Sequence, residues 1–253
     1  MTVLCYHSVE SSWASPLTVD PGDFDRHCSW LRRHRQVLSL DELLPHRVRG
    51  GRSMRRAVAL TFDDGFAALY EHALPVLLRH RLPATVFVVA RTLVDDRPID
   101  WIDPDPPAPQ RALSGEQIRA MRELGVMFGS HSFAHHDLTS LSEDECLRDL
   151  RRSREVLEEF LGEPTRVLAY PYGRHSAHVR RAAERAGFDF ALALPERREA
   201  PGRFAVPRAG VYRGNGTAAL RAKTSPQYVA WRTGRLYSMV ARLRRAAAPT
   251  PSI

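Results

Sequence analysis

Cysteines are few in this sequence, and none of them lie close together. Cys5, Cys28 and Cys146 are the three cysteines among 253 residues, and no two of them have the C-x-x-C spacing of a thiolate zinc site or a redox centre. An odd number of dispersed thiols also argues against a disulfide framework. This usage excludes a disulfide-rich secreted domain and favours a reducing compartment such as the cytoplasm.

Long apolar runs are lacking as well. No stretch approaches the roughly 18 consecutive apolar residues that a membrane-spanning helix needs. The opening segment from Met1 to Ser8 has no cationic region followed by an apolar run, as a secretory signal would have. We therefore predict a cytoplasmic protein without a transmembrane helix.

Acidic residues are outnumbered by basic ones. The chain has 37 Lys and Arg against 29 Asp and Glu, which gives a formal net charge of +8. A basic surface favours anionic partners such as phospholipid headgroups, glycolipid phosphates or nucleic acid. Because the sequence has neither zinc-finger spacing nor an aromatic RNA-binding motif, we expect no nucleic-acid partner.

Short apolar runs alternate with amphipathic stretches along the chain. The composition, with 43% hydrophobic and 26% charged residues, is typical of a soluble globular protein. The alternation predicts strands that each feed a helix in a mainly parallel sheet or barrel. Seven predicted strands suit an α/β barrel of roughly TIM type. They span 3–6, 57–62, 84–90, 127–129, 167–170, 188–194 and 204–206.

Amphipathic segments predict the helices, over 23–35, 67–80, 114–123, 142–161, 177–186 and 227–245. Ser114 and Ser142 are each followed three residues later by Gln or Glu, the spacing of a capping box. The basic helix over 227–245 could pack on the domain or lie on a membrane surface. We predict one domain over 1–246 and a disordered tail over 247–253.

Two adjacent acids, Asp63 and Asp64, follow an apolar run. They lie in Thr61-Phe62-Asp63-Asp64-Gly65, directly after Ala57-Val58-Ala59-Leu60. The C-terminal ends of barrel strands are where active sites form. Neighbouring carboxylates repel each other unless a cation or a proton stabilises them. The segment therefore predicts a catalytic or metal-binding turn, with a plain Asp-Asp-Gly turn as the structural alternative.

Two histidines with a four-residue spacing follow another apolar run. His131 and His135, in Gly129-Ser130-His131-Ser132-Phe133-Ala134-His135, could share one metal ion. Joined to Asp64, they would supply two imidazole nitrogens and one carboxylate and leave positions open for water and substrate. This donor set favours zinc and would also accept cobalt, nickel or iron. A histidine-rich loop without a metal is the alternative.

A third segment, Leu168-Ala169-Tyr170-Pro171-Tyr172-Gly173, joins a strand to a turn. Such a turn can present a backbone N–H to a developing oxyanion. Tyr170, Pro171 and Tyr172 are the predicted substrate contacts if the turn has this role. By itself, the segment favours a simple strand-to-helix connection.

Together, these three segments resemble the motifs of the polysaccharide deacetylase family, also called the NodB-homology family. The resemblance spans roughly residues 1–215 and implies a distorted (β/α)7-type barrel. It also implies roles for five residues: Asp63 as base, Asp64, His131 and His135 as metal ligands, and Tyr172 as the donor of an amide to the oxyanion.

Two departures from the family pattern affect the predicted site. Many members carry an arginine at the start of the third motif, where this chain has Ala169. We predict that Arg208 orients Asp63 instead, with a surface arginine as the alternative. Many members also carry an acid histidine near the C-terminus. Here Val3-Leu4-Cys5-Tyr6-His7-Ser8 resembles a permuted branch in which that histidine comes first, so His7 is the predicted general acid. A structural histidine at a strand end is the alternative.

The resemblance implies a metal-dependent carbohydrate N-deacetylase, a hydrolase that acts on C–N bonds other than peptide bonds. Its expected partner is an N-acetylated sugar, glycoside or glycolipid. A cytoplasmic location would favour nucleotide-linked, lipid-linked or small glycosides over chitin and peptidoglycan. Three alternatives stay open: a hydrolase of cyclic imides or ureides, a non-haem iron oxygenase, and a non-catalytic carbohydrate-binding protein.

Overall fold

The structure is a computed structural model that describes residues 1–49, 54–95, 98–102, 108–194, 202–225, 227, 228 and 231, with only the backbone described at 47–49. Most of the helix predicted over 227–245, and the whole tail predicted over 247–253, lie outside these residues. The single-domain boundary at 246 therefore stays a prediction. Within the described ranges, no helix is long and apolar enough to cross a membrane.

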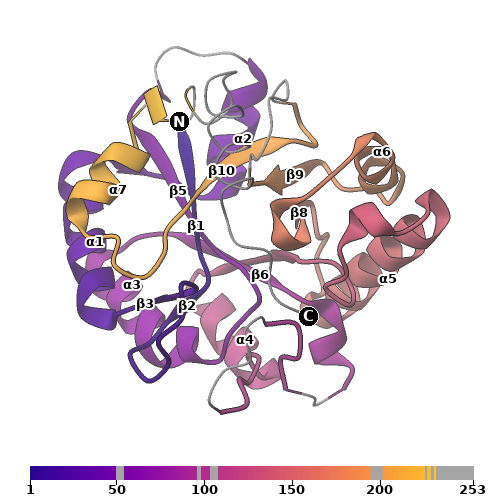
Figure 1. Ribbon diagram of the computed structural model, residues 1–253, viewed down its shortest axis with the longest axis horizontal. Helices are drawn as coiled ribbons and strands as arrows, with labels where there is room; N and C mark the ends of the chain where they lie inside the picture. The colour runs from indigo at the N-terminus through magenta and orange to yellow at the C-terminus, as the bar shows by residue number, and fades with distance from the viewer. Residues whose placement is uncertain are drawn as a thin grey trace, which may run out of the picture.

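Seven parallel strands close into a barrel (Figure 1). They are β1 (Thr2–Tyr6), β5 (Ala57–Phe62), β6 (Ala84–Val88), β7 (Met127–Ser130), β8 (Val167–Ala169), β9 (Phe190–Ala193) and β10 (Val206–Gly210). Their order is β1-β10-β9-β8-β7-β6-β5, and β5 pairs again with β1 to close the ring. The predicted α/β barrel is confirmed.

Within the described ranges, three two-residue strands add further pairing. Strand β4 (Gln36–Val37) adds to the start of β5, while β2 (Ser8–Val9) pairs with β3 (Thr18–Val19) outside the barrel. The predicted strand over 204–206 is displaced, since β10 begins at Val206 and continues through Arg208. Arg208 is therefore a barrel residue and does not follow the strand as predicted.

Helices surround the strands (Figure 1). They are α1 (Pro21–His34), α2 (Leu40–Arg49), α3 (Leu74–His80), α4 (Gly115–Glu123), α5 (Glu143–Leu161), α6 (Ala177–Arg185) and α7 (Thr217–Lys223). The capping boxes predicted at Ser114 and Ser142 are confirmed. The helix predicted over 67–80 differs, because a π-helical turn (Leu69–Ala73) precedes α3.

Inward and outward side chains alternate along the strands, as pleated strands require. In β5, Val58 and Leu60 pack outward in the large core beneath the surrounding helices. Ala57 and Ala59 pack in a second cluster, which is the barrel interior. Leu43 and Leu44 of α2 belong to the same cluster, so α2 closes the barrel at the N-terminal ends of its strands.

The inward-facing positions become more polar toward the C-terminal ends of the strands. In β5 and the residue after it, they are Ala57, Ala59, Thr61 and Asp63. In β1 and the residue after it, they are Val3, Cys5 and His7. The parallel register pairs Cys5 with Thr61, so these two series reach the same level. The chemistry-bearing residues therefore gather at one end of the barrel.

Candidate metal and catalytic site

Asp64, His131 and His135 converge beyond the ends of β5 and β7. Their candidate ligand atoms all lie within 4.8 Å of one another, and the three residues are buried. Oδ1 of Asp64 lies 3.2 Å from Nε2 of His135 and 3.7 Å from Nε2 of His131. One carboxylate oxygen thus faces two imidazole nitrogens, which makes this a possible site for a divalent ion.

The histidine chemistry fits a metal ligand. Nδ1 of His131 lies 2.7 Å from the carbonyl oxygen of Ala169. Because a carbonyl only accepts, Nδ1 carries the proton and Nε2 carries the lone pair. Nε2 lies 3.7 Å from Oδ1 of Asp64 and 3.9 Å from Oδ2 of Asp63. Burial lowers the pKa of His131 to about 4, although Asp63 opposes that shift. The ring is therefore neutral at pH 7, as metal binding requires.

The loop that carries His135 is fixed by its own hydrogen bonds. The backbone N–H of His135 donates to Oγ of Ser132 over 3.0 Å. The backbone N–H of Phe133 donates to Oδ1 of Asp149, on α5, over 2.9 Å. These bonds hold the turn between the two histidines without using either imidazole.

Asp63, the neighbour of Asp64, has a different set of partners. The guanidinium of Arg208 donates from Nη1 to Oδ1 over 2.6 Å and from Nη2 to Oδ2 over 2.7 Å. Both side chains are almost completely buried. A two-pronged, fully desolvated contact of this kind fixes both the position and the plane of the carboxylate. The contact expected between Arg208 and Asp63 is thus present in the structure.

The charge state of Asp63 follows from this pairing. Burial alone would raise the pKa of Asp63, but Arg208 and His131 together lower it to about 2. The carboxyl group is therefore ionised at neutral pH. Cys5 adds a third donor, since its thiol lies 3.3 Å from Oδ2 of Asp63. Burial is the main cause that raises the pKa of Cys5, so the thiol keeps its proton.

His7 lies on the β1 side of Asp63. Candidate ligand atoms of Cys5, His7 and Asp63 all lie within 4.8 Å of one another, so these residues form a second group with metal-ligand spacing. Both carboxylate oxygens of Asp63 already accept hydrogen bonds from Arg208. The positive charge of Arg208 also opposes the binding of a further cation there. We therefore interpret this group as a proton-handling cluster. His7 is partly exposed, and its ring stacks on Tyr212 with centroids 6.5 Å apart.

In the turn after β8, one tyrosine contacts the candidate site and the other is buried in the core. The ring of Tyr172 contacts His135 edge to face, with centroids 4.8 Å apart, and is 45% exposed. Tyr170 is fully buried, and its hydroxyl donates to the carbonyl of Phe204 over 3.1 Å. Pro171 is also buried. The substrate contacts predicted for Tyr170 and Pro171 do not fit these positions, because both side chains pack inside the protein and shape the turn.

Left-handed backbone is concentrated around the site. Among described residues other than glycine, five have positive φ, and four of them belong here: Asp64 (69°), Ser132 (68°), His135 (58°) and Tyr172 (57°). Such conformations are uncommon outside glycine, although Asp and His adopt them more often than most residues, and they gather at functional sites. Each one turns the chain sharply, so the predicted ligands from two loops and the Tyr172 turn from a third converge on one point.

Trp101 is a site residue that the sequence analysis missed. Its indole Nε1–H donates to Oδ1 of Asp64 over 2.8 Å, and its ring stacks on His135 with centroids 5.0 Å apart. Cys5 was missed in the same way. Trp101 lies outside the three motifs, and Cys5 lies in the segment that carries His7, where nothing in the sequence shows that its thiol contacts Asp63.

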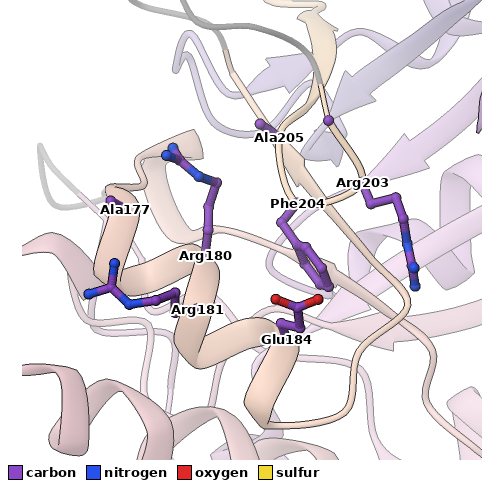
Figure 2. Close-up of a pocket in the computed structure, with 8 residues that line it drawn as sticks. Ala177, Arg180, Arg181, Glu184, Arg203, Phe204 and Ala205 are labelled. Carbon is purple, nitrogen blue, oxygen red and sulfur yellow. The ribbon is translucent and has the colours of Figure 1, made fainter.

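A separate cavity lies beside α6. It lies between α6 and Phe204 (Figure 2). Its volume is about 540 Å³. Its lining residues include none of the predicted site residues. Of the arginines there, Arg181 is paired with Glu143 at 2.7 Å, and Arg203 donates to the backbone of Asp189. We assign this cavity no part in the chemistry.

Comparison with known proteins identifies the family. The model of the family described as "Polysaccharide deacetylase" matches residues 50–191, more than half of the chain. The chain belongs to the polysaccharide deacetylase family. The matched range contains Asp63, Asp64, His131 and His135, and it excludes His7 and Arg208.

A curated relative of this deacetylase-family chain agrees with the assignment. A poly-beta-1,6-N-acetyl-D-glucosamine N-deacetylase from Staphylococcus aureus (strain MRSA252) is 25% identical over 194 residues, which are 73% of this chain and 63% of the relative. The chain thus spans 63% of the length of that curated relative.

Two solved structures share the fold of this family member. One is the Streptococcus pyogenes deacetylase PplD in complex with acetate, with a TM-score of 0.77 and 22% identity over 89% of this chain and 98% of that one. The other is IcaB from Ammonifex degensii, with a TM-score of 0.70 and 26% identity over 92% of this chain and 97% of that one.

Proposed function

We propose that this family member is a metal-dependent N-deacetylase that releases acetate from an N-acetylated sugar, glycoside or glycolipid. One observation carries the proposal: of two adjacent aspartates, Asp64 faces both imidazoles, while both carboxylate oxygens of Asp63 accept hydrogen bonds from Arg208. Oδ2 of Asp63 still lies 3.9 Å from Nε2 of His131, so the base is beside the proposed metal site. A hydrolase of this kind needs both a ligand set and a free base. The two neighbours supply one each.

Asp64, His131 and His135 would hold the ion, because their donor atoms are buried, close together and aimed inward. Two imidazoles and one carboxylate suit zinc best, with cobalt, nickel or iron as substitutes. A divalent ion there would act as a Lewis acid toward the acetamide carbonyl and make the attacking water more acidic. The set leaves open positions for both molecules, as catalytic sites require.

Asp63 and His7 would handle the protons. Asp63 is ionised, buried and fixed in orientation by Arg208, so it can take the proton of the attacking water. His7 stands near the same carboxylate from β1 and can give a proton to the leaving amine. This division of roles corresponds to the permuted branch, in which the acid histidine precedes the aspartates.

The backbone N–H of Tyr172 would stabilise the oxyanion. Tyr172 has a left-handed backbone, and its ring contacts the predicted ligand His135. A rigid donor in a water-poor site stabilises negative charge that develops on the acetyl oxygen. The exposed part of the Tyr172 ring offers a surface for the sugar.

The substrate class follows from the relatives. Because the Staphylococcus aureus relative is named for poly-beta-1,6-N-acetyl-D-glucosamine, N-acetylglucosamine units are the first compounds to test. Nucleotide-linked and lipid-linked forms of this sugar belong in the same test. Contact with a membrane surface through the helix predicted over 227–245 is a further part of this proposal.

The test is acetate release from a panel of compounds. The panel contains N-acetylglucosamine oligomers of different linkage, a nucleotide-linked N-acetyl sugar, a glycolipid and a cyclic imide. Each is assayed with the metal-loaded protein, after chelation, and after zinc is restored. We expect acetate from at least one N-acetylated sugar, loss on chelation and recovery with zinc. Opening of the cyclic imide without acetate release would replace this proposal with the rival amidohydrolase.

Two variants separate the base from the ligands. Asp63→Asn should lower turnover by a factor of about 100 or more while zinc still binds, because a general base is lost and the ligands remain. His131→Ala should lose both zinc and turnover. Asp25→Asn is the matched control, since Asp25 lies between Arg79 and His80 on the surface, with both contacts at 2.9 Å. Normal turnover in Asp63→Asn would show that the base is another residue.

A further inference from the structure

Trp101 contacts two of the three predicted ligands at once. Its Nε1–H donates to Oδ1 of Asp64 over 2.8 Å. Its ring lies nearly parallel to that of His135, with an interplanar angle of 23° and centroids 5.0 Å apart. Trp101 comes from the segment after β6, which carries none of the family motifs. A segment outside the motifs therefore contacts the side chains of two predicted metal ligands.

The oxygen that Trp101 contacts is the one that faces the imidazoles. Oδ1 of Asp64 lies 3.2 Å from Nε2 of His135 and 3.7 Å from Nε2 of His131. A carboxylate oxygen has two lone pairs, so it can face an ion and still accept the indole proton. The hydrogen bond from the indole therefore fixes which oxygen of Asp64 faces the two imidazoles. It also restricts rotation of the Asp64 side chain before a metal ion binds, so metal binding costs less conformational entropy.

The stack around His135 continues on both sides. Arg91 places its guanidinium carbon 5.1 Å from the centroid of the Trp101 ring, and Arg91 is also paired with Asp100. The ring of Tyr172 contacts His135 edge to face. His135 is thus held between two aromatic side chains, and Trp101 is itself held by Arg91. Such packing limits the orientation of a ligand ring.

We propose that Trp101 is a positioning residue that sets the metal affinity of this site, and that its fluorescence reports whether the site is occupied. The inference rests on the proposed metal-dependent function. Partners that orient metal ligands contribute roughly ten- to hundredfold to metal affinity. Loss of the indole N–H frees Asp64 to rotate, whereas loss of the ring also frees His135.

The chain contains a matched control for this stack. Trp30 stacks on His34 with centroids also 5.0 Å apart, and Arg35 lies over its ring at 4.6 Å. That arginine–tryptophan–histidine stack lies on α1, away from the site. Trp30→Phe therefore removes the same kind of indole from the same kind of stack without touching a predicted ligand.

The experiment titrates Co²⁺ into the full-length protein after metal removal. It follows heat of binding, visible absorption of cobalt and tryptophan fluorescence. We expect Trp101→Phe to raise the dissociation constant for Co²⁺ by roughly ten- to hundredfold and to shift the cobalt absorption. Trp30→Phe should change neither the dissociation constant nor the absorption. Wild type and Trp30→Phe should both lose fluorescence as Co²⁺ binds, because the ion lies beside Trp101. Trp101→Phe should lose most of that quenching.

Each outcome decides one question. Wild-type affinity and absorption in Trp101→Phe would overturn the proposal for Trp101. No Co²⁺ or Zn²⁺ binding by the wild type would instead overturn the proposed metal site itself. The metal-free melting temperatures of the two variants serve as the folding control. If Trp101→Phe does not fold, the fluorescence of the wild type and of Trp30→Phe still tests the proposal. Unchanged fluorescence in both proteins at saturating Co²⁺ would show that Trp101 does not lie beside the bound ion.

Discussion

The two ends of the barrel are formed by the same strands but differ in what their interiors contain. At the N-terminal ends, Val3 and Ala57 pack against Leu43 of α2 in an apolar cluster. At the C-terminal ends, the same inward-facing series reach His7 and Asp63. The comparison suggests that the apolar end mainly supplies stability and the polar end mainly supplies chemistry, and substitutions at each end can test that separation.

Arg208→Met should have the largest effect, because Arg208 links the two roles. Removing one partner of a buried ion pair leaves Asp63 charged and unpaired, which costs about 3–5 kcal/mol of unfolding free energy. Turnover should fall by about a hundredfold as the base loses its orientation. Urea denaturation and acetate release measure the two effects.

Arg79→Met is the control for Arg208, since Arg79 pairs with Asp25 on the surface at 2.9 Å. It should change stability by less than about 1 kcal/mol. A similar loss in both variants would mean that burial of the Arg208 pair has no special importance.

Leu43→Ala should lower the stability of the apolar end without affecting metal binding at the polar end. Leu43 is completely buried beneath the barrel, and removing its side chain there should cost about 2–5 kcal/mol of unfolding free energy. Zinc affinity, measured by titration of the folded protein, should stay unchanged. Leu78→Ala, at a position 43% exposed, should cost less than about 0.5 kcal/mol. Weaker zinc binding in Leu43→Ala would show that the two ends are coupled.

Lowering the pH should reduce the contribution of the polar end to the free energy of unfolding. We expect this effect to be smaller than those of Arg208→Met and Leu43→Ala. Burial would raise the pKa of Asp63, but Arg208 and His131 hold it at about 2. The ionised carboxylate therefore stabilises the fold above its unfolded-state pKa near 4, and this contribution is lost as the pH falls toward 2. Relative to Asp63→Asn, metal-free wild type should lose about 1 kcal/mol of unfolding free energy between about pH 5 and about pH 3. A constant difference would indicate an ordinary pKa for Asp63.

The sequence predicted the barrel well because its strands are short apolar runs with clear ends. It missed α2, which contains Pro45. A signal for that helix was present, since Ser39 and Glu42 make reciprocal hydrogen bonds like those of a capping box. The π-helical turn before α3 has no distinct sequence pattern, so the predicted helix over 67–80 ran straight through it.

Site residues within motifs were predictable, whereas those brought in by tertiary structure were not. Asp64 and His131 lie in recognisable local patterns. Arg208 was selected from its place near a late strand, but its reach to Asp63 depends on the register of β10 with β1, where Arg208 pairs with Val3. Trp101 and Cys5 are single residues, and only the folded chain shows what they contact.

The left-handed turns at Asp64 and His135 impose a second requirement on positions that chemistry already restricts. A side chain branched at Cβ fits poorly at positive φ, whereas Asp and Asn tolerate it. At Asp64, an asparagine would preserve the turn and lose the charge, while a valine would disturb both. Few neutral substitutions are therefore open to evolution at these two positions, and an ancestor with a different loop shape would have had to change backbone and ligand together.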